Sequence, residues 1–103
     1  MNTEIKAFLG GYRLQQAKIN RLYEMMEQNP ANANAYLSEI EKCKHRRAQI
    51  EKTIDSIGQE LHKEVLCQKY ICGKSLEEIA FSLNYSKRHI ERIHLAALNL
   101  LKL

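Results

Sequence analysis

The 103-residue chain has one proline, four glycines and no tryptophan. Because proline and glycine interrupt helices and form many tight turns, this scarcity favours long, rarely broken elements. No apolar run approaches the roughly 20 residues that cross a bilayer, and the first residues lack the basic and then apolar order of a secretory signal. We therefore expect a cytoplasmic protein that consists of one domain, or of a small domain with an appendage.

Cysteine is also scarce, and Cys43, Cys67 and Cys72 form no Cys-x-x-Cys pair. An odd number of cysteines without such a pair indicates neither a disulfide framework nor a zinc ribbon. A cluster of His62, Cys67 and Cys72 would be an unusual metal site for one helix, so we expect ordinary buried thiols, no metal and no cofactor. The sequence also lacks a glycine-rich phosphate loop and a nucleophile in a recognisable turn, which argues against an enzyme.

Basic residues are in modest excess over acidic ones, with 16 Lys and Arg against 12 Asp and Glu and a net charge of +4. The basic excess lies after residue 41, partly in the stretch from Lys42 to Lys52. Such an excess suits an electrostatic contact with nucleic acid, but a solvated helix face has the same composition. Charge alone therefore does not separate the two interpretations.

Two stripes of mostly apolar residues repeat in steps of three and four, which is a heptad pattern. The first consists of Ile5, Phe8, Tyr12, Gln15, Ile19, Leu22 and Met26. The second consists of Ile40, Cys43, Arg47, Ile50, Ile54, Ile57 and Leu61. Because only a short Asn/Pro/Ala connection separates them, we predict an all-α fold in which residues 1–59 form an antiparallel, coiled-coil-like helical hairpin.

Two further expectations concern this hairpin. Gly10 and Gly11 each cost roughly 1 kcal/mol inside a helix, so the first helix is expected to kink there or to begin near Tyr12. The arms are too long to be covered by a compact C-terminal part alone, so part of the stripe is expected to be exposed. This suggests a homodimer or a higher oligomer that assembles through the hairpin.

Residues 60–103 show shorter helical patterns, separated by turn residues. Gly73 suits the left-handed end of a helix, and Ser75 with Glu78 has the spacing of a capping box. Asn84 tolerates the left-handed turn, and Ser86 caps the last helix. We therefore predict a helix-turn-helix over residues 76–95, with Ala80 where the helices cross. The residues expected to lock it are Ile79, Leu83, Tyr85, Ile90 and Ile93.

Three further side chains are expected to pack in the core rather than to act on a ligand. Tyr70 and Tyr85 are interpreted as core aromatics. His94 has an apolar flank and is interpreted as a packed, hydrogen-bonded histidine.

Once Ile90 and Ile93 face the core, the outer face of the last helix follows from helical geometry, and it is the face that enters the major groove in DNA-binding proteins of this type. Arginine and lysine there bind guanine edges or phosphates, a capping serine binds phosphate, and glutamate accepts from cytosine. The candidate DNA-binding residues are Lys74, Ser86, Lys87, Arg88, His89, Glu91 and Arg92. The alternative is a solvated basic face without a ligand.

The run Lys-Tyr-Ile-Cys-Gly-Lys-Ser-Leu-Glu-Glu-Ile-Ala at 69–80 is followed by Leu-Asn-Tyr-Ser at 83–86 and by Arg88, Arg92-Ile93-His94 and Ala97-Leu98. This C-terminal part resembles region 4 of bacterial sigma factors. More closely, it resembles small phage and mobile-element proteins in which a helical hairpin precedes a sigma-region-4-like helix-turn-helix, relatives of phage late-gene activators. The resemblance implies sequence-specific binding to double-stranded DNA and contact with RNA polymerase. Nothing in the chain corresponds to the sigma region that melts promoter DNA.

These observations favour a DNA-binding transcriptional regulator of phage or mobile-element origin, with residues 60–103 as the DNA-binding domain. Two alternatives stay open. A phage DNA-packaging recognition subunit would form a closed ring of many copies, and a polymerase-binding adaptor would lack salt-dependent DNA affinity.

Overall fold

The computed structural model describes residues 2–101, which are helical throughout apart from short connections and contain no strand. This confirms the expected all-α class. The five α-helices of the described part are α1 (Thr3–Gln28), α2 (Ala33–Asp55), α3 (Glu60–Leu66), α4 (Leu76–Leu83) and α5 (Lys87–Leu100). A short 3-10 segment, η1 (Pro30–Asn32), joins α1 to α2, and a π-helical segment, η2 (Cys67–Ile71), extends α3.

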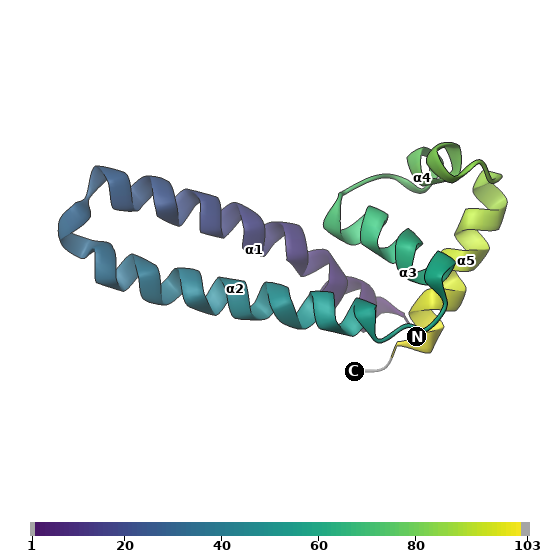
Figure 1. Cartoon of the computed structure of the whole chain (residues 1–103), viewed down its shortest axis with the longest axis horizontal. Helices are drawn as coiled ribbons and strands as arrows, with labels where there is room; N and C mark the ends of the chain where they lie inside the picture. Colours follow the sequence, from purple (N-terminus) through teal and green to yellow (C-terminus); the bar gives the residue numbers. More distant parts are fainter. Residues whose placement is uncertain (1, 102–103) are drawn as a thin grey trace.

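The molecule is elongated, with extents of 52 × 27 × 21 Å, because α1 and α2 reach far beyond the other helices. The two lie side by side and run in opposite directions, while α3, α4 and α5 gather at the end where α1 begins (Figure 1). The connection between α2 and α3 contains the expected boundary between residues 59 and 60. One core cluster crosses it, since Ile5 and Ile54 pack with Leu66 and Leu98.

The predicted stripes face each other along this helix pair. Toward the far end, Ile19 and Leu22 of α1 pack with Ile40 and Cys43 of α2 in a cluster of their own. The polar position Gln15 is also buried. Within the described residues no member of either stripe is exposed, because the stripes face each other and their end near the start of α1 also packs against α3, η2 and α5. The expectation that part of a stripe lies exposed is therefore wrong. The stripes therefore offer no surface for self-association.

The expectation that α1 begins near Tyr12 is also wrong. The helix is continuous from Thr3 to Gln28 and passes through both glycines. Its first turns carry Ile5 and Leu9, which are buried in the core with residues of α2 and α5. This burial offsets the roughly 1 kcal/mol that each glycine costs inside a helix.

Three predicted terminus signals are confirmed. Ser75 Oγ accepts the Glu78 N–H at 3.1 Å, and the Glu78 carboxylate accepts the Ser75 N–H at 3.0 Å, which completes the capping box. Gly73 has a φ of 75° and Asn84 a φ of 62°, so both adopt the left-handed conformation that their turns require. These local features set the ends of η2 and α4.

Some side-chain expectations need correction. Tyr85 is 44% exposed and is not a core aromatic, whereas Tyr70 is buried as predicted. Of the cysteines, only Cys43 is buried, since Cys67 is half-buried and Cys72 is exposed. Among residues 2–101, no helix combines the length and apolar character needed to cross a membrane.

Candidate nucleic-acid interface

The turn between α4 and α5 is held by hydrogen bonds between residues close in the sequence. Past the end of α4, the Tyr85 N–H donates to the Ala80 carbonyl at 2.9 Å and the Asn84 N–H donates to the Phe81 carbonyl at 3.3 Å. This is the Schellman pattern, which needs a left-handed residue at Asn84. Directly afterwards, Ser86 Oγ accepts the His89 N–H at 3.1 Å and caps α5. The two helices are thus joined in a defined geometry by three residues.

The inner faces of α4 and α5 meet in one apolar cluster. Ile79 and Ala80 of α4 pack with Ile90 and Ile93 of α5 and with Val65 of α3. Ile79, Ile90 and Val65 are fully buried. This packing fixes the rotation of α5, so its outer face is determined as well. Of the predicted locking residues, Tyr85 is the one that does not join the cluster.

A buried polar pair continues the inner face of α5. His94 is 7% exposed, and its Nε2 lies 2.8 Å from Tyr70 Oη in a hydrogen bond. Burial, together with the nearby charges of Lys69 and Lys6, lowers the pKa of His94 to about 4. The imidazole is therefore neutral at pH 7, and the interpretation of His94 as a packed, hydrogen-bonded core residue is confirmed.

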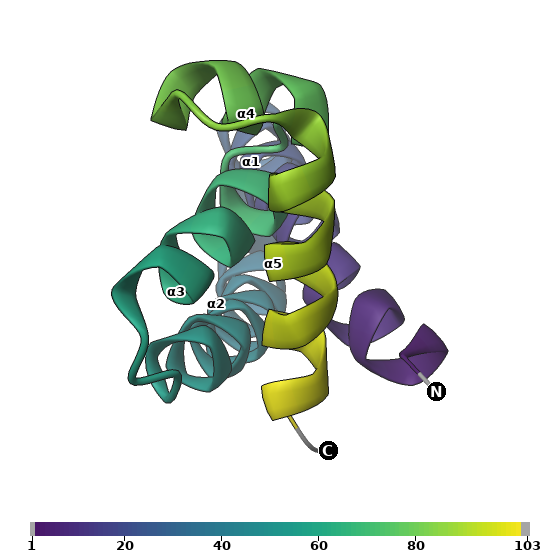
Figure 2. The same ribbon diagram turned by 90° about the vertical axis from the view of Figure 1, so that its right-hand side faces the viewer.

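The outer face of α5 presents two arginines to solvent. Figure 2 shows the ribbon of α5 toward the viewer, with α3 beside it and α4 at its upper end. Arg88 and Arg92 are both exposed and lie four residues apart, which places them one above the other on one helix face. Within residues 2–101, neither forms an ion pair with a carboxylate. Their guanidinium groups are therefore available to a ligand with acceptor atoms, such as a base edge or a phosphate.

Lys87 and Glu91 differ from the two arginines because they take part in ion pairs. Lys87 Nζ lies 3.2 Å from a carboxylate oxygen of Glu77 in α4 and 4.0 Å from one of Glu91. These pairs are more than half exposed, so they hold the lysine only weakly. Lys87 thus contributes to the same end of α5 as Arg88, but with its charge partly balanced.

His89 lies at the edge of the outer face, half-buried against its neighbours. Its ring stacks on that of Tyr85, with centroids 4.9 Å apart, and Arg92 Nη2 donates toward its Nδ1 over 3.4 Å. The ring therefore holds Tyr85 and Arg92 near the start of α5. The Ser86 hydroxyl accepts the His89 N–H as the cap of α5. Ser86 is nevertheless exposed, so a ligand would meet the solvent side of this residue.

Lys74 does not join the residues on α5. Its ammonium group lies 3.4 Å from Gln68 Oε1, so it points toward η2, before α4. The other six candidate residues lie at the start of α5 and in the turn before it. The structure thus brings together Ser86, Lys87, Arg88, His89, Glu91 and Arg92 and leaves Lys74 apart.

Two features were missed from the sequence. Leu95 is 53% exposed and extends the face of Arg88 and Arg92, a position that helical spacing alone would have revealed. Arg13 of α1 is the second, since its Nη1 donates to the Ile71 carbonyl at 3.5 Å and its guanidinium covers Gly73 so closely that a Cβ there would overlap it. No sequence signal joins residues so far apart along the chain.

The described residues contain no group of three or more His, Cys, Asp or Glu side chains arranged to hold a metal ion. Comparison with protein-family models, with curated proteins and with solved structures found no match to this chain.

Proposed function

We propose that α4 and α5 form a sigma-region-4-like helix-turn-helix and that the protein is a sequence-specific, DNA-binding transcriptional regulator of phage or mobile-element origin. The observation that carries the proposal is the pair Arg88 and Arg92, exposed and without ion pairs among residues 2–101, on a helix whose opposite face is locked. The resemblance of residues 69–98 to region 4 supports the same assignment and suggests RNA polymerase as a second partner.

In this proposal the first turns of α5 enter the major groove. Arg88 and Arg92 bind guanine edges, and Ser86 with the amide groups at the helix start binds a backbone phosphate. Leu95, on the same face, suits the apolar contact that a thymine methyl group offers. Glu91 accepts from a cytosine amino group when Lys87 turns toward phosphate.

The test begins with selection of bound fragments from a random duplex library, because the operator is unknown. The affinity of the selected duplex is then measured by fluorescence anisotropy for the wild-type chain and for Arg88→Ala/Arg92→Ala. Since a bidentate arginine contact contributes about 1 to 3 kcal/mol, the double variant should bind at least about 30-fold more weakly.

The matched control is Arg21→Ala/Arg46→Ala, which removes the same charge from exposed positions on α1 and α2. It should bind the selected duplex with nearly the wild-type affinity. Equal affinities for the wild type and the Arg88/Arg92 variant, or a wild type without salt-dependent DNA binding, would refute the proposal. The second result would favour the adaptor hypothesis.

A further inference from the structure

The outer face of α4 carries a solvent-exposed aromatic ring. Phe81 is 91% exposed, although phenylalanine is usually buried. Glu77 and Glu78 precede it by four and three residues, so they lie on the same side of the helix. Residues 75–86 contain these two acidic residues and no basic one. We call Glu77, Glu78 and Phe81 the α4 face.

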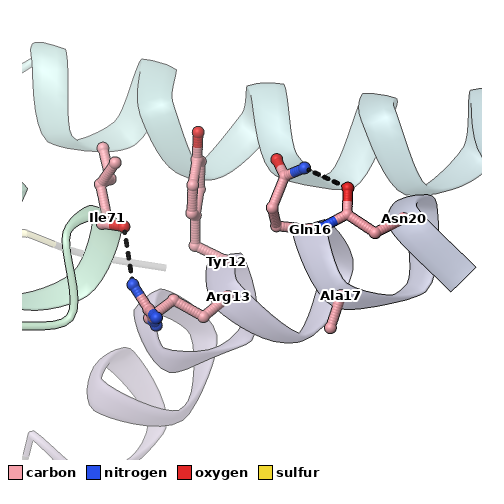
Figure 3. A pocket seen from close by; sticks show the side chains of 6 residues that line it. All are labelled: Tyr12, Arg13, Gln16, Ala17, Asn20 and Ile71. Carbon is pink, nitrogen blue, oxygen red and sulfur yellow. Dashed lines mark hydrogen bonds between the residues drawn. The ribbon is translucent and has the colours of Figure 1, made fainter.

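A groove on α1 has the opposite character. It has a volume of about 200 Å³ and lies beside η2, where Figure 3 shows Arg13 directed at the carbonyl of Ile71. Its lining consists of Tyr12, Arg13, Gln16, Ala17, Asn20 and Ile71. From Ile5 to Tyr23 the chain has four basic residues and no acidic one. We call this hollow the α1 groove.

The two surfaces match in size and in charge. A cavity of about 150 Å³ accepts a benzene ring, so the α1 groove has room for a phenyl side chain. Tyr12, Ala17 and Ile71 offer apolar walls, and a guanidinium such as that of Arg13 is attracted to the face of an aromatic ring. The carboxylates of Glu78 and of Glu77, which also pairs with Lys87, complement the basic residues of α1.

Other occupants of the α4 face fit less well. DNA phosphates would be repelled by Glu77 and Glu78, so this face does not suit the DNA backbone. Within one chain the ring of Phe81 stays exposed, so the molecule's own groove does not take it. A second copy of the chain carries the α1 groove, because its sequence is the same.

We propose that the α4 face of one copy docks in the α1 groove of a second copy, with Phe81 inserted beside Arg13. This inference goes beyond DNA binding and does not rest on it. Because one ring and its surroundings form a small contact, the association is weak and reversible, as for interfaces below about 1,200 Å². Since two different surfaces meet, it is head to tail unless a twofold arrangement lets both pairs form at once.

The test uses two variants that each remove one partner surface. Phe81→Ser removes the ring, and Ala17→Trp fills the groove; both positions are exposed, so both variants should fold, which circular dichroism checks. Sedimentation equilibrium without DNA is run from about 10 µM to about 1 mM, the range where weak complexes form. Leu95→Ser, which removes an exposed leucine outside both surfaces, is the matched control.

The expected result is a wild type and a Leu95→Ser variant whose average mass rises with concentration, while each of the other two variants alone stays monomeric. An equimolar mixture of Phe81→Ser and Ala17→Trp should form a one-to-one complex, because one supplies the groove and the other the ring. A wild type that is monomeric up to about 1 mM, association that persists in both variants, or a mixture that does not associate would overturn the proposal.

Discussion

Helices α4 and α5 are built alike on the inside and differ on the outside. Each is preceded by a serine whose hydroxyl accepts the N–H three residues later, and both bury isoleucines in the same cluster. The outer face of α4 carries two carboxylates and a phenyl ring, whereas that of α5 carries Arg88 and Arg92. The side chains that α4 and α5 bury in one cluster thus set the positions of both helices. Their outer faces take no part in this packing, which leaves them free to bind different partners.

Removal of the inner packing that α4 and α5 share should have the largest effect. Ile90→Ala should lower the free energy of unfolding by about 2 to 5 kcal/mol, because the fully buried side chain leaves a cavity among Ile79, Ile93 and Val65. Urea denaturation followed by circular dichroism measures the loss. The control Leu95→Ala, on the exposed face of the same helix, should stay within about 0.5 kcal/mol of the wild type.

A second prediction concerns His94, which is buried in its neutral form on the inner face of α5. His94 has a pKa of about 4 in the folded chain against an ordinary 6.5, so the unfolded chain binds its proton more tightly. The stability that depends on neutral His94 is fully present above pH 6.5 and is lost as the pH falls toward 4. The loss amounts to about 3 kcal/mol.

Denaturation of the wild type and of His94→Gln across this pH range isolates the effect, since the variant should lack this part of the pH dependence. Titration of the histidine ring protons by NMR gives the pKa directly. A His94 that titrates near pH 6.5 would contradict the prediction.

The serine caps of α4 and α5 should make the smallest contributions to stability and should differ in their dependence on pH. Ser75→Ala and Ser86→Ala should each cost about 1 kcal/mol at pH 7. The pKa of Glu78 is lowered because its carboxylate accepts the Ser75 backbone N–H, so the α4 box is complete above about pH 4.5 and weakens as the pH falls below it. At α5 the corresponding residue is His89, which does not close such a box.

Thermal denaturation at pH 7 and pH 3 checks this. The penalty of Ser75→Ala should be smaller at pH 3 than at pH 7, because protonation of the Glu78 carboxylate weakens the box as the pH falls. An unchanged penalty for Ser75→Ala at the two pH values would show that Glu78 does not support the cap.

Much of the fold could be predicted because its signals are local. The two heptad stripes, the capping serines and the left-handed Asn84 and Gly73 act within a few residues, and all of them are found where the sequence places them. Of the two outcomes expected at Gly10 and Gly11, a helix start near Tyr12 was wrong, because the penalty of the glycines is local whereas the burial that offsets it comes from α2 and α5.

The candidate site divides in the same way. Helical spacing by itself places Arg88 and Arg92 on one face, once Ile90 and Ile93 are known to be buried. The pairing of Lys87 with Glu77, and the separation of Lys74 from the rest, depend on how α4 lies against its neighbours. No periodicity carries that information.

Local sequence patterns thus predict that this chain is helical, where most of its helices end, and which arginines share the outer face of α5. The packing of separate helices establishes that the two stripes are buried, that Tyr85 and Phe81 are exposed, and that Arg13 meets Gly73 beside a groove. The difference arises from the distance over which each interaction acts. Caps and periodicity act over about one turn of helix, whereas burial and cross-helix contacts depend on how separate elements pack.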